Sequence, residues 1–176
     1  MDNPHEKEMN PLSQIADRYR RWRHTRGFGV HSPIAYRIIT EALYLRPPYA
    51  YYAEALPALE GDSADESRWG RRIYRLTVLL AMEHRRPPRI YIAPRIAPIV
   101  KEAAILAGAC VSEDAAEADA LLLQPEGHSP ANDNDEDKYE ELSALFDPST
   151  SLRLTSRRLS IIIPRSVLGP TRYTLP

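Results

Sequence analysis

The longest amphipathic segment of the chain covers residues 68–84. Its apolar residues Trp69, Ile73, Leu76 and Leu80 follow one another at i, i+4, i+7 and i+11, which is the spacing of one helix face. Further apolar side chains widen this stripe, so we expect the helix to pack against both a sheet and a second helix. The Arg-Arg-Pro-Pro sequence that follows ends the helix.

A shorter helical pattern precedes this segment. Ile34 and Ile38 lie on one side of a helix that Ser32 would cap and that Pro33, suited to the first helical position, would open. Residues 57–67, which contain small and acidic residues and a glycine, predict a loop between the two helices.

The second half of the chain alternates short apolar runs with helical and polar segments. Apolar runs of this length between turn residues are typical of buried strands. We expect strands at 89–93, 109–113, 118–125 and 159–163, an edge strand at 152–155, and helices at 96–107 and 138–146. Strands that are apolar throughout are buried on both faces, which favours a mostly parallel sheet of four or five strands covered by helices on both faces. The predicted fold class is α/β.

The same pattern divides the chain into three regions. Residues 1–12 are polar and interrupted by prolines, and we expect a disordered tail. Residues 13–60 form a helical N-terminal extension. Residues 61–176 form the α/β domain, whose size is ordinary for one hydrophobic core.

Composition narrows the functional classes. The chain is 43% hydrophobic and carries a net charge of −1, so its charge as a whole favours no polyanionic partner. The start of the chain does not resemble a signal peptide, and no apolar run approaches the ~20 residues that span a bilayer. We therefore expect a cytoplasmic protein with no membrane partner. Cys110 is the single cysteine, which excludes an intrachain disulfide, and we expect it to pack at the start of a buried strand.

Charge is concentrated in blocks. Residues 113–141 hold eleven carboxylates, but their spacing is not that of a calcium loop, and we expect no metal site. Residues 17–26 interleave arginine with aromatic residues, which would suit a nucleic-acid surface. The residues of that alternative are Arg18, Arg20, Arg21, Trp22, Arg23 and Arg26. We favour an amphipathic helix whose aromatic residues dock on the domain and whose arginines are solvated.

Four stretches together resemble a group of bacterial methyltransferase-like proteins. Residues 26–44, RGFGVHSPIAYRIITEALY, resemble the Gly-(Ile/Val)-His-Ser-Pro signature at the N-terminus of that group. Residues 68–94 resemble its next helix and first strand, and 118–128 and 158–169 resemble two later strands. The resemblance implies a small Rossmann-like sheet that binds S-adenosylmethionine. It would place His31 at the cofactor cleft, although a structural hydrogen bond beside the helix cap is the simpler role for this histidine.

The departures from that group concern the cofactor site. Its first strand runs into a glycine-rich turn, where glycine lets the backbone approach the ligand. Here the turn begins at Ala93 and continues through Arg95 with prolines on either side, and prolines supply no N–H donor. Gln124 stands where the group has an aspartate, and Glu113, at the end of the second strand, would be the residue nearest a ribose. We expect these positions to be a vestigial cofactor site, and Glu113 to be a surface carboxylate.

The absence of common catalytic motifs argues modestly against an enzyme. We therefore expect a degenerate methyltransferase-like domain that binds no cofactor and acts as a binding or scaffold module, through a protein partner or as a homo-oligomer. One alternative is an S-adenosylmethionine-dependent methyltransferase with an atypical cofactor loop. The other is nucleic-acid binding through residues 18–26.

Overall fold

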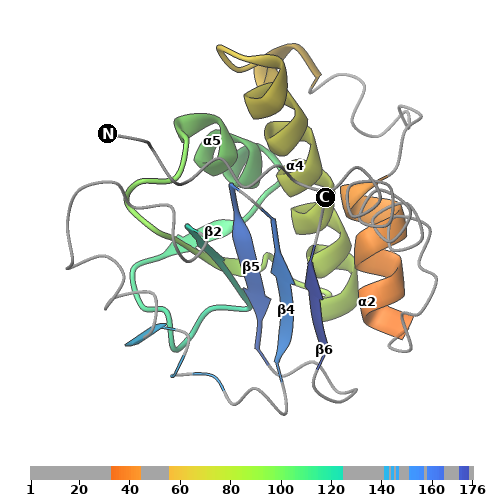
Figure 1. Ribbon diagram of the computed structural model, residues 1–176, viewed down its shortest axis with the longest axis vertical. Helices are drawn as coiled ribbons and strands as arrows, with labels where there is room; N and C mark the ends of the chain where they lie inside the picture. Colours follow the sequence, from red (N-terminus) through yellow and green to blue (C-terminus); the bar gives the residue numbers. More distant parts are fainter. Residues whose placement is uncertain are drawn as a thin grey trace, which may run out of the picture.

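A six-stranded sheet forms the centre of the protein (Figure 1). The computed structural model describes residues 33–44, 56–124, 151–156, 158–164 and 171–174, together with 141, 142, 144 and 146. The strand order is β2-β1-β3-β5-β4-β6. The strands are β1 (Arg89–Ile92), β2 (Cys110–Ser112), β3 (Ala120–Leu123), β4 (Leu152–Thr155), β5 (Ser160–Ile163) and β6 (Thr171–Thr174).

The sheet is mixed, and the α/β class is confirmed. β1 runs parallel to both β2 and β3, and β4 runs parallel to β6, whereas β5 is antiparallel to its neighbours β3 and β4. Three of the five strand pairs are parallel, in line with the mostly parallel sheet that the sequence predicts. The exception is β5, because only a short turn separates it from β4 and a parallel pair needs a long crossover. The strand at 152–155 is confirmed, but it is not an edge, because β6 pairs with its free side.

Ser156 closes the turn between β4 and β5. Its backbone N–H donates to the carbonyl of Leu159 at 2.9 Å, and its Oγ accepts from the backbone N–H of Leu159 at 2.9 Å. A turn closed in this way brings the second strand straight back beside the first. It is the physical reason that β5 is antiparallel.

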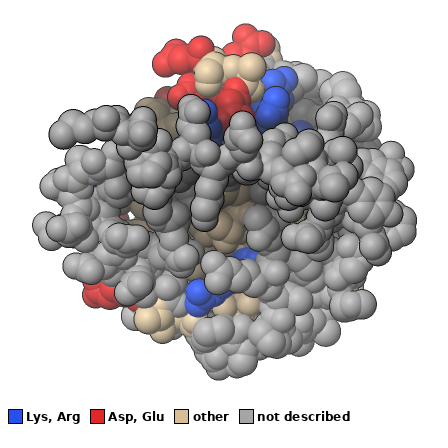
Figure 2. Space-filling view, viewed as in Figure 1, with Lys and Arg blue, Asp and Glu red and all other residues tan. Residues whose placement is uncertain are grey.

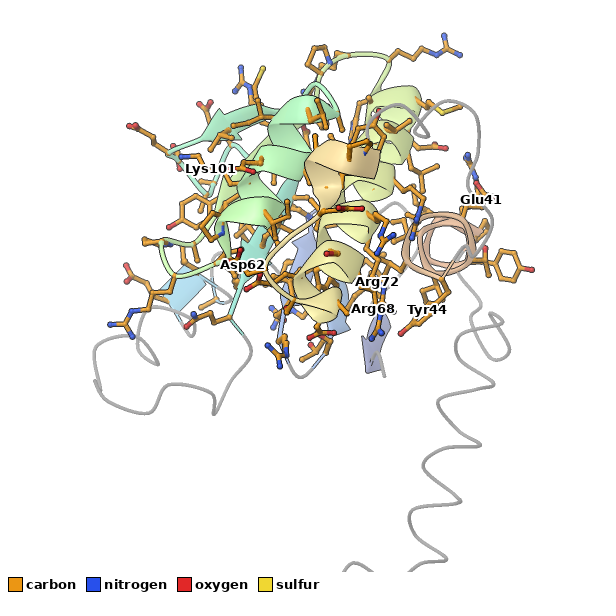
Figure 3. All side chains as sticks on the ribbon, turned by 90° about the horizontal axis from the view of Figure 1, so that it is seen from above. Glu41, Tyr44, Asp62, Arg68, Arg72 and Lys101 are labelled. Atoms are coloured by element: carbon orange, nitrogen blue, oxygen red, sulfur yellow. The ribbon has the colours of Figure 1, made fainter. Side chains whose placement is uncertain are left out.

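Residues 141, 142 and 144, which belong to the helix predicted at 138–146, are helical, and Leu142 packs on one face of the sheet. The helices with full bounds form a layer on the other face. They are α2 (Pro33–Arg37), which continues as the π-helix η1 (Ile38–Leu43), the 3-10 turn η2 (Leu56–Leu59), α4 (Ala64–His84) and α5 (Pro98–Leu106). Figures 1 and 3 show α4 in the middle of this layer, with α5 on one side and α2 on the other. Their apolar faces share a single core with Ile90, Leu122, Leu154 and Ile161 of the sheet. The opposite face packs Leu121, Leu123 and Ile162 against Phe146.

The helix expected at 68–84 begins earlier than its hydrophobic pattern indicates. The Oγ of Ser63 accepts a hydrogen bond from the backbone N–H of Glu66 at 3.1 Å, so Ser63 is the N-cap and α4 starts at Ala64. The Ser-x-x-Glu sequence here is a capping-box signature. At the other end Arg85 adopts a left-handed conformation with φ of 54°, which ends the helix before the prolines.

Gly70 allows α4 and α5 to pack closely. A Cβ at this position would lie 3.0 Å from Cγ1 of Ile99 and 3.3 Å from the carbonyl oxygen of Leu59. Any larger residue would have to push α5 or η2 away, so the glycine fixes how near the loop after β1 comes to α4.

Two arginines of α4 hold the end of η1. The Nε of Arg75 donates to the carbonyl of Ala42 at 2.7 Å, and the Nε of Arg72 donates to the carbonyl of Leu43 at 2.9 Å. These carbonyls at a helix end have no partner within their own helix. Arg72 also lies over the rings of Tyr44 and Trp69, 4.9 and 4.7 Å from their centroids (Figure 3).

The buried position of this cluster shifts two pKa values. Burial lowers the pKa of Arg72, an effect that the nearby Tyr44 opposes. Burial likewise raises the pKa of Tyr44 to about 12, although the charge of Arg72 opposes the shift. Tyr44 is therefore neutral and Arg72 charged at neutral pH.

A second polar cluster joins the turn before β1 to the start of β3. The guanidinium of Arg86 donates to both oxygens of Asp119 at 2.8 and 2.7 Å, and the backbone N–H of Arg89 donates to Oδ2 of Asp119 at 2.8 Å. Burial alone would raise the pKa of Asp119, but the hydrogen bonds from Arg86 and Arg89 and nearby positive charge outweigh it, so this pKa is lowered.

The edge strand β2 differs from expectation. Cys110 is exposed, and Val111 is exposed as well, so the prediction that Cys110 packs in a buried strand is wrong. The reason is that β2 ends the sheet and has β1 as its single neighbour among the described strands.

We expect Arg75→Met to lower the free energy of unfolding by about 2 kcal/mol, because it leaves the carbonyl of Ala42 without its donor in the core. Urea unfolding followed by circular dichroism measures the change. The control is Arg68→Met, since Arg68 is exposed and makes a surface ion pair with Asp65, for which we expect less than about 1 kcal/mol. Equal losses in both variants would contradict the role of Arg75.

We expect the stabilising effect of Asp119 to depend on pH. Its pKa in the folded protein lies below the unfolded value, so its contribution is full above the unfolded pKa and is lost as the pH falls through the folded pKa. Asp119→Asn should therefore cost about 1 kcal/mol at pH 7 and progressively less below about pH 4. Thermal unfolding at several pH values, with Glu117→Gln as an exposed control, measures this. A pH-independent loss would show that the charge of Asp119 is unimportant.

Candidate functional site

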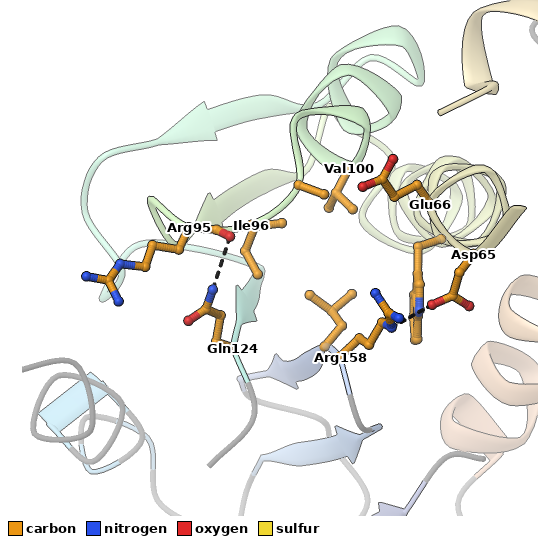
Figure 4. A pocket seen from close by; sticks show the side chains of 10 residues that line it. Asp65, Glu66, Arg95, Ile96, Val100, Gln124 and Arg158 are labelled. Atoms are coloured by element: carbon orange, nitrogen blue, oxygen red, sulfur yellow. Dashed lines mark hydrogen bonds and ion pairs between the residues drawn. The ribbon is translucent and has the colours of Figure 1, made fainter. Parts of the chain in front are cut away.

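A pocket of about 220 Å³ opens where β1 and β3 end (Figure 4). Its apolar wall is formed by Trp69 of α4, Ile96 and Ala97 of the loop after β1, Val100 of α5, and Leu159 of the turn before β5. Three separate parts of the chain therefore meet here, at the carboxyl ends of two parallel strands. This end of the sheet is where open α/β folds bind ligands.

Two polar bridges within the protein flank the pocket. The Nε2 of Gln124, just after β3, donates to the carbonyl of Arg95 at 3.1 Å (Figure 4). On the other side, the Nε of Arg158 lies 2.7 Å from Oδ2 of Asp65. Glu66, in the first turn of α4, and Arg95 are the other charged residues of the lining, and the side chain of Arg95 points away from the pocket (Figure 4). The pocket thus combines an apolar wall with two polar bridges, one on each side.

Charged side chains also surround the pocket on the outer surface. Figure 2 shows acidic and basic side chains close together over the start of α4, at the top of the view. Asp65 contacts Arg158 and also Arg68, at 3.4 Å, so it takes part in two surface ion pairs. Pairs this exposed contribute little to stability.

The loop after β1 is compact and contains no glycine. The backbone N–H of Ala93 donates to the carbonyl of Leu122 at 3.0 Å, which keeps the loop beside β3. The N–H of Ile96 then donates to the carbonyl of Ala93 at 3.1 Å and closes a turn. Pro98 opens α5 without a side-chain cap, and it supplies no N–H toward the pocket. The backbone here offers a phosphate or carboxylate few donors.

The lining residues limit the chemistry of the pocket. None of its described lining residues is a serine, threonine, cysteine, histidine or lysine, so the carboxylates of Asp65 and Glu66 are the lining groups of a type that commonly acts as a nucleophile or general base. One of these two carboxylates, that of Asp65, is paired with Arg158 and Arg68. Over the ranges that the structure describes, no group of three or more His, Cys, Asp or Glu residues could hold a metal ion.

The structure brings together part of the predicted vestigial site. Arg95 and Gln124 line one pocket and are joined by a hydrogen bond, and Ala93 begins the loop between them. Glu113 is exposed after β2 and is not among the pocket residues, which agrees with its being a surface carboxylate. His31 lies outside the described residues.

The arginine-aromatic alternative is likewise outside what the structure describes. This applies to Arg18, Arg20, Arg21, Trp22, Arg23 and Arg26. Nucleic-acid binding through this segment therefore stays a prediction from sequence.

Of the ten pocket residues, sequence reasoning identified Arg95 and Gln124 as site residues, and three of those it missed show why. Asp65 was assigned to a loop, although the Ser63-x-x-Glu66 capping signature would have placed it in the first turn of α4. Trp69 was expected only as a core residue. Arg158 had no signal, because its position depends on the turn between β4 and β5, which local sequence did not predict.

We expect Gln124→Ala to loosen the loop after β1. The variant loses the hydrogen bond to the carbonyl of Arg95, worth about 1 kcal/mol, which corresponds to an opening equilibrium about fivefold larger. Amide hydrogen exchange at Ile96 should become faster by this factor, while exchange at Ala93, bonded to Leu122, changes less. Glu113→Ala is the matched control and should leave both amides unchanged. Unaltered exchange at Ile96 in Gln124→Ala would contradict the bridge.

Known proteins give no further guide to this site. No protein-family model, curated protein or solved structure matches the chain. Over the described residues, no helix is long and apolar enough to cross a membrane. The function of the chain is therefore inferred from its sequence and from the geometry of this pocket.

Proposed function

We propose that the chain is a degenerate methyltransferase-like domain that does not catalyse a reaction and serves as a binding or scaffold module. The observation that carries the proposal is the closed junction after β1, where a turn without glycine is tied to Gln124 and leaves a pocket of about 220 Å³. Pockets for cofactors and drug-sized ligands usually have about 300–1,000 Å³. A nucleoside cofactor would need this loop to move away.

The strand order supports a Rossmann-like origin for this junction. From β1 the chain passes through α5 to β2 on one side, and then returns to β3 on the other side of β1. The strand order reverses between β1 and β3, and in open α/β sheets the ligand binds at such a switch point. The pocket with Arg95 and Gln124 lies there. This position supports the proposal that the pocket is the remnant of a cofactor site whose residues have changed.

The changed residues remove the two main features of a dinucleotide or S-adenosylmethionine site. Pro94 and Pro98 replace flexible backbone with residues that lack an N–H, and Gln124 stands in place of an acid. A glutamine side chain cannot act as a base, and here it serves the fold by holding the loop. What remains is a stable domain whose surfaces, rather than its pocket, are available to a partner.

Titration calorimetry with S-adenosylmethionine and S-adenosylhomocysteine tests the proposal. We expect no saturable heat from a folded sample at ligand concentrations up to about 1 mM, because a nucleoside cannot enter the closed junction. A methyltransferase known to bind the same ligand is the positive control, and circular dichroism shows that the sample is folded. Saturable heat that disappears in an Ala97→Trp variant, which fills the pocket, would overturn the proposal and restore the methyltransferase alternative.

A further inference from the structure

The outer edge of β2 has no strand partner among the described residues, and its residues Cys110 and Val111 are exposed. The backbone N–H of Cys110 donates to the carbonyl of Pro88 at 2.9 Å, so the polar backbone groups of Cys110 are directed toward β1. The backbone N–H and C=O groups of successive residues in a strand point to alternate sides of the strand. Those of Val111 therefore point away from β1. β2 is the terminal strand in the sheet that the structure describes (Figure 1).

Exposed apolar side chains accompany this edge. Val111 pairs in register with Ile90, whose side chain is in the core beneath the helices, so Val111 lies on the helix face of the sheet. Val111 is 38% exposed, and Ile105 and Leu106 at the end of α5 are 52% and 48% exposed. The chain connects them directly, since α5 ends at Leu106 and β2 starts at Cys110. Three of the five large hydrophobic residues recorded as exposed in the described ranges thus belong to one short segment.

The charge of the segment favours a second copy of the same chain. Residues 105–112 have the sequence ILAGACVS and contain no charged side chain. Two identical edges can therefore meet without repulsion between like charges, and β2 carries none of the lysines, prolines or inward charges that protect many sheet edges. Because β2 has three residues, the exposed apolar side chains beside it must supply much of the contact. Glu113 and Asp114 follow at one end, and an antiparallel arrangement separates the acidic ends of the two copies.

We propose that two copies of this chain associate through β2, with the strands antiparallel and Val111 opposite Val111 of the second copy. The outward N–H and C=O of each Val111 then form a pair of hydrogen bonds around a two-fold axis, which gives the closed symmetry of most homodimers. Ile105 and Leu106 of both copies cover the pair on the helix face. This inference rests on the proposed scaffold function, because it names the partner that such a module binds.

A proline variant tests the backbone contact. Val111→Pro removes the outward N–H but no hydrogen bond to β1, and proline is tolerated in edge strands with this orientation. Light scattering after size-exclusion chromatography should give twice the chain mass of 20.0 kDa for the natural sequence and one chain mass for Val111→Pro. The matched control Val111→Thr keeps the N–H and the branched side chain, and it should remain a dimer. Circular dichroism confirms that each variant is folded.

A crosslinking experiment tests the register independently of stability. The chain has one cysteine, so Cys110→Ser with Val111→Cys leaves a single thiol at the proposed axis. Two residues that face each other in a hydrogen-bonded antiparallel pair have Cα atoms about 5.5 Å apart, which is within the range of a disulfide. With diamide as oxidant, the two thiols form one disulfide, and diamide takes up the two protons and two electrons. We expect a covalent dimer from this variant and none from Cys110→Ser alone.

A further pair of variants tests the exposed apolar side chains beside β2. Ile105→Asp places a charge among the exposed residues beside β2 and should give the monomer. Tyr36→Asp places the same charge on α2, which lies on the other side of α4 and is also exposed, and should leave the dimer intact (Figure 1).

Three results would overturn the inference. The first is that the natural chain is a monomer at every concentration tested. This result would count against the inference even if another part of the chain covers the edge of β2. A dimer could persist in Val111→Pro, or the thiol at position 111 could fail to crosslink, which would place the contact on another surface. None of these results affects the calorimetric test of the closed cofactor junction. Saturable binding of S-adenosylmethionine by a dimer that forms through β2 would instead overturn the proposed function alone.

Discussion

The helix layer of this protein depends on α4, and two arginine side chains of α4 attach the helix formed by α2 and η1 to it. Arg75 and Arg72 donate to the last carbonyls of η1, which a helix end leaves without partners. Because Arg75 is buried, removing it would leave a polar group in the core rather than return it to water. The aromatic rings of Tyr44 and Trp69 enclose Arg72, so the same residue connects the helix end to the wall of the pocket.

Hydrophobic periodicity predicted the elements whose environment is determined by neighbours close in sequence. The helix expected at 68–84 and the strand at 89–93 are present. A wide apolar stripe at helical spacing is buried only as a helix, and a short apolar run between turn residues is typical of a buried strand. The start of α4 was missed because Ser63 acts through a hydrogen bond to the backbone and contributes nothing to periodicity. Greater attention to the capping signature would have corrected it.

Sheet order and exposure were harder to predict, since they depend on contacts between distant parts of the chain. An apolar run such as Ser160–Ile163 is compatible with either direction beside a neighbouring strand, and the turn closed by Ser156 makes it antiparallel to β4. Cys110 and Val111 resemble buried-strand residues, yet they are exposed because β2 has no second neighbour within the described sheet. For the candidate site, Arg95 and Gln124 could be predicted because each follows a strand in the sequence. The place of Arg158 in the pocket could not be predicted, because it depends on how distant strands pack together.

The position of β5 in the middle of the sheet has a consequence for how the chain folds. Leu121 of β3 pairs with Ile162 of β5, so β3 acquires its second neighbour only when the last part of the chain is present. During synthesis, β1, β2 and β3 can assemble with α4 and α5. The backbone groups on one edge of β3 stay unpaired until the hairpin of β4 and β5 is made. Pairing between strands so distant in sequence is slow, because the loop must close before the contacts form. The partly made sheet is therefore the stage at which this protein is most exposed to aggregation in the cell.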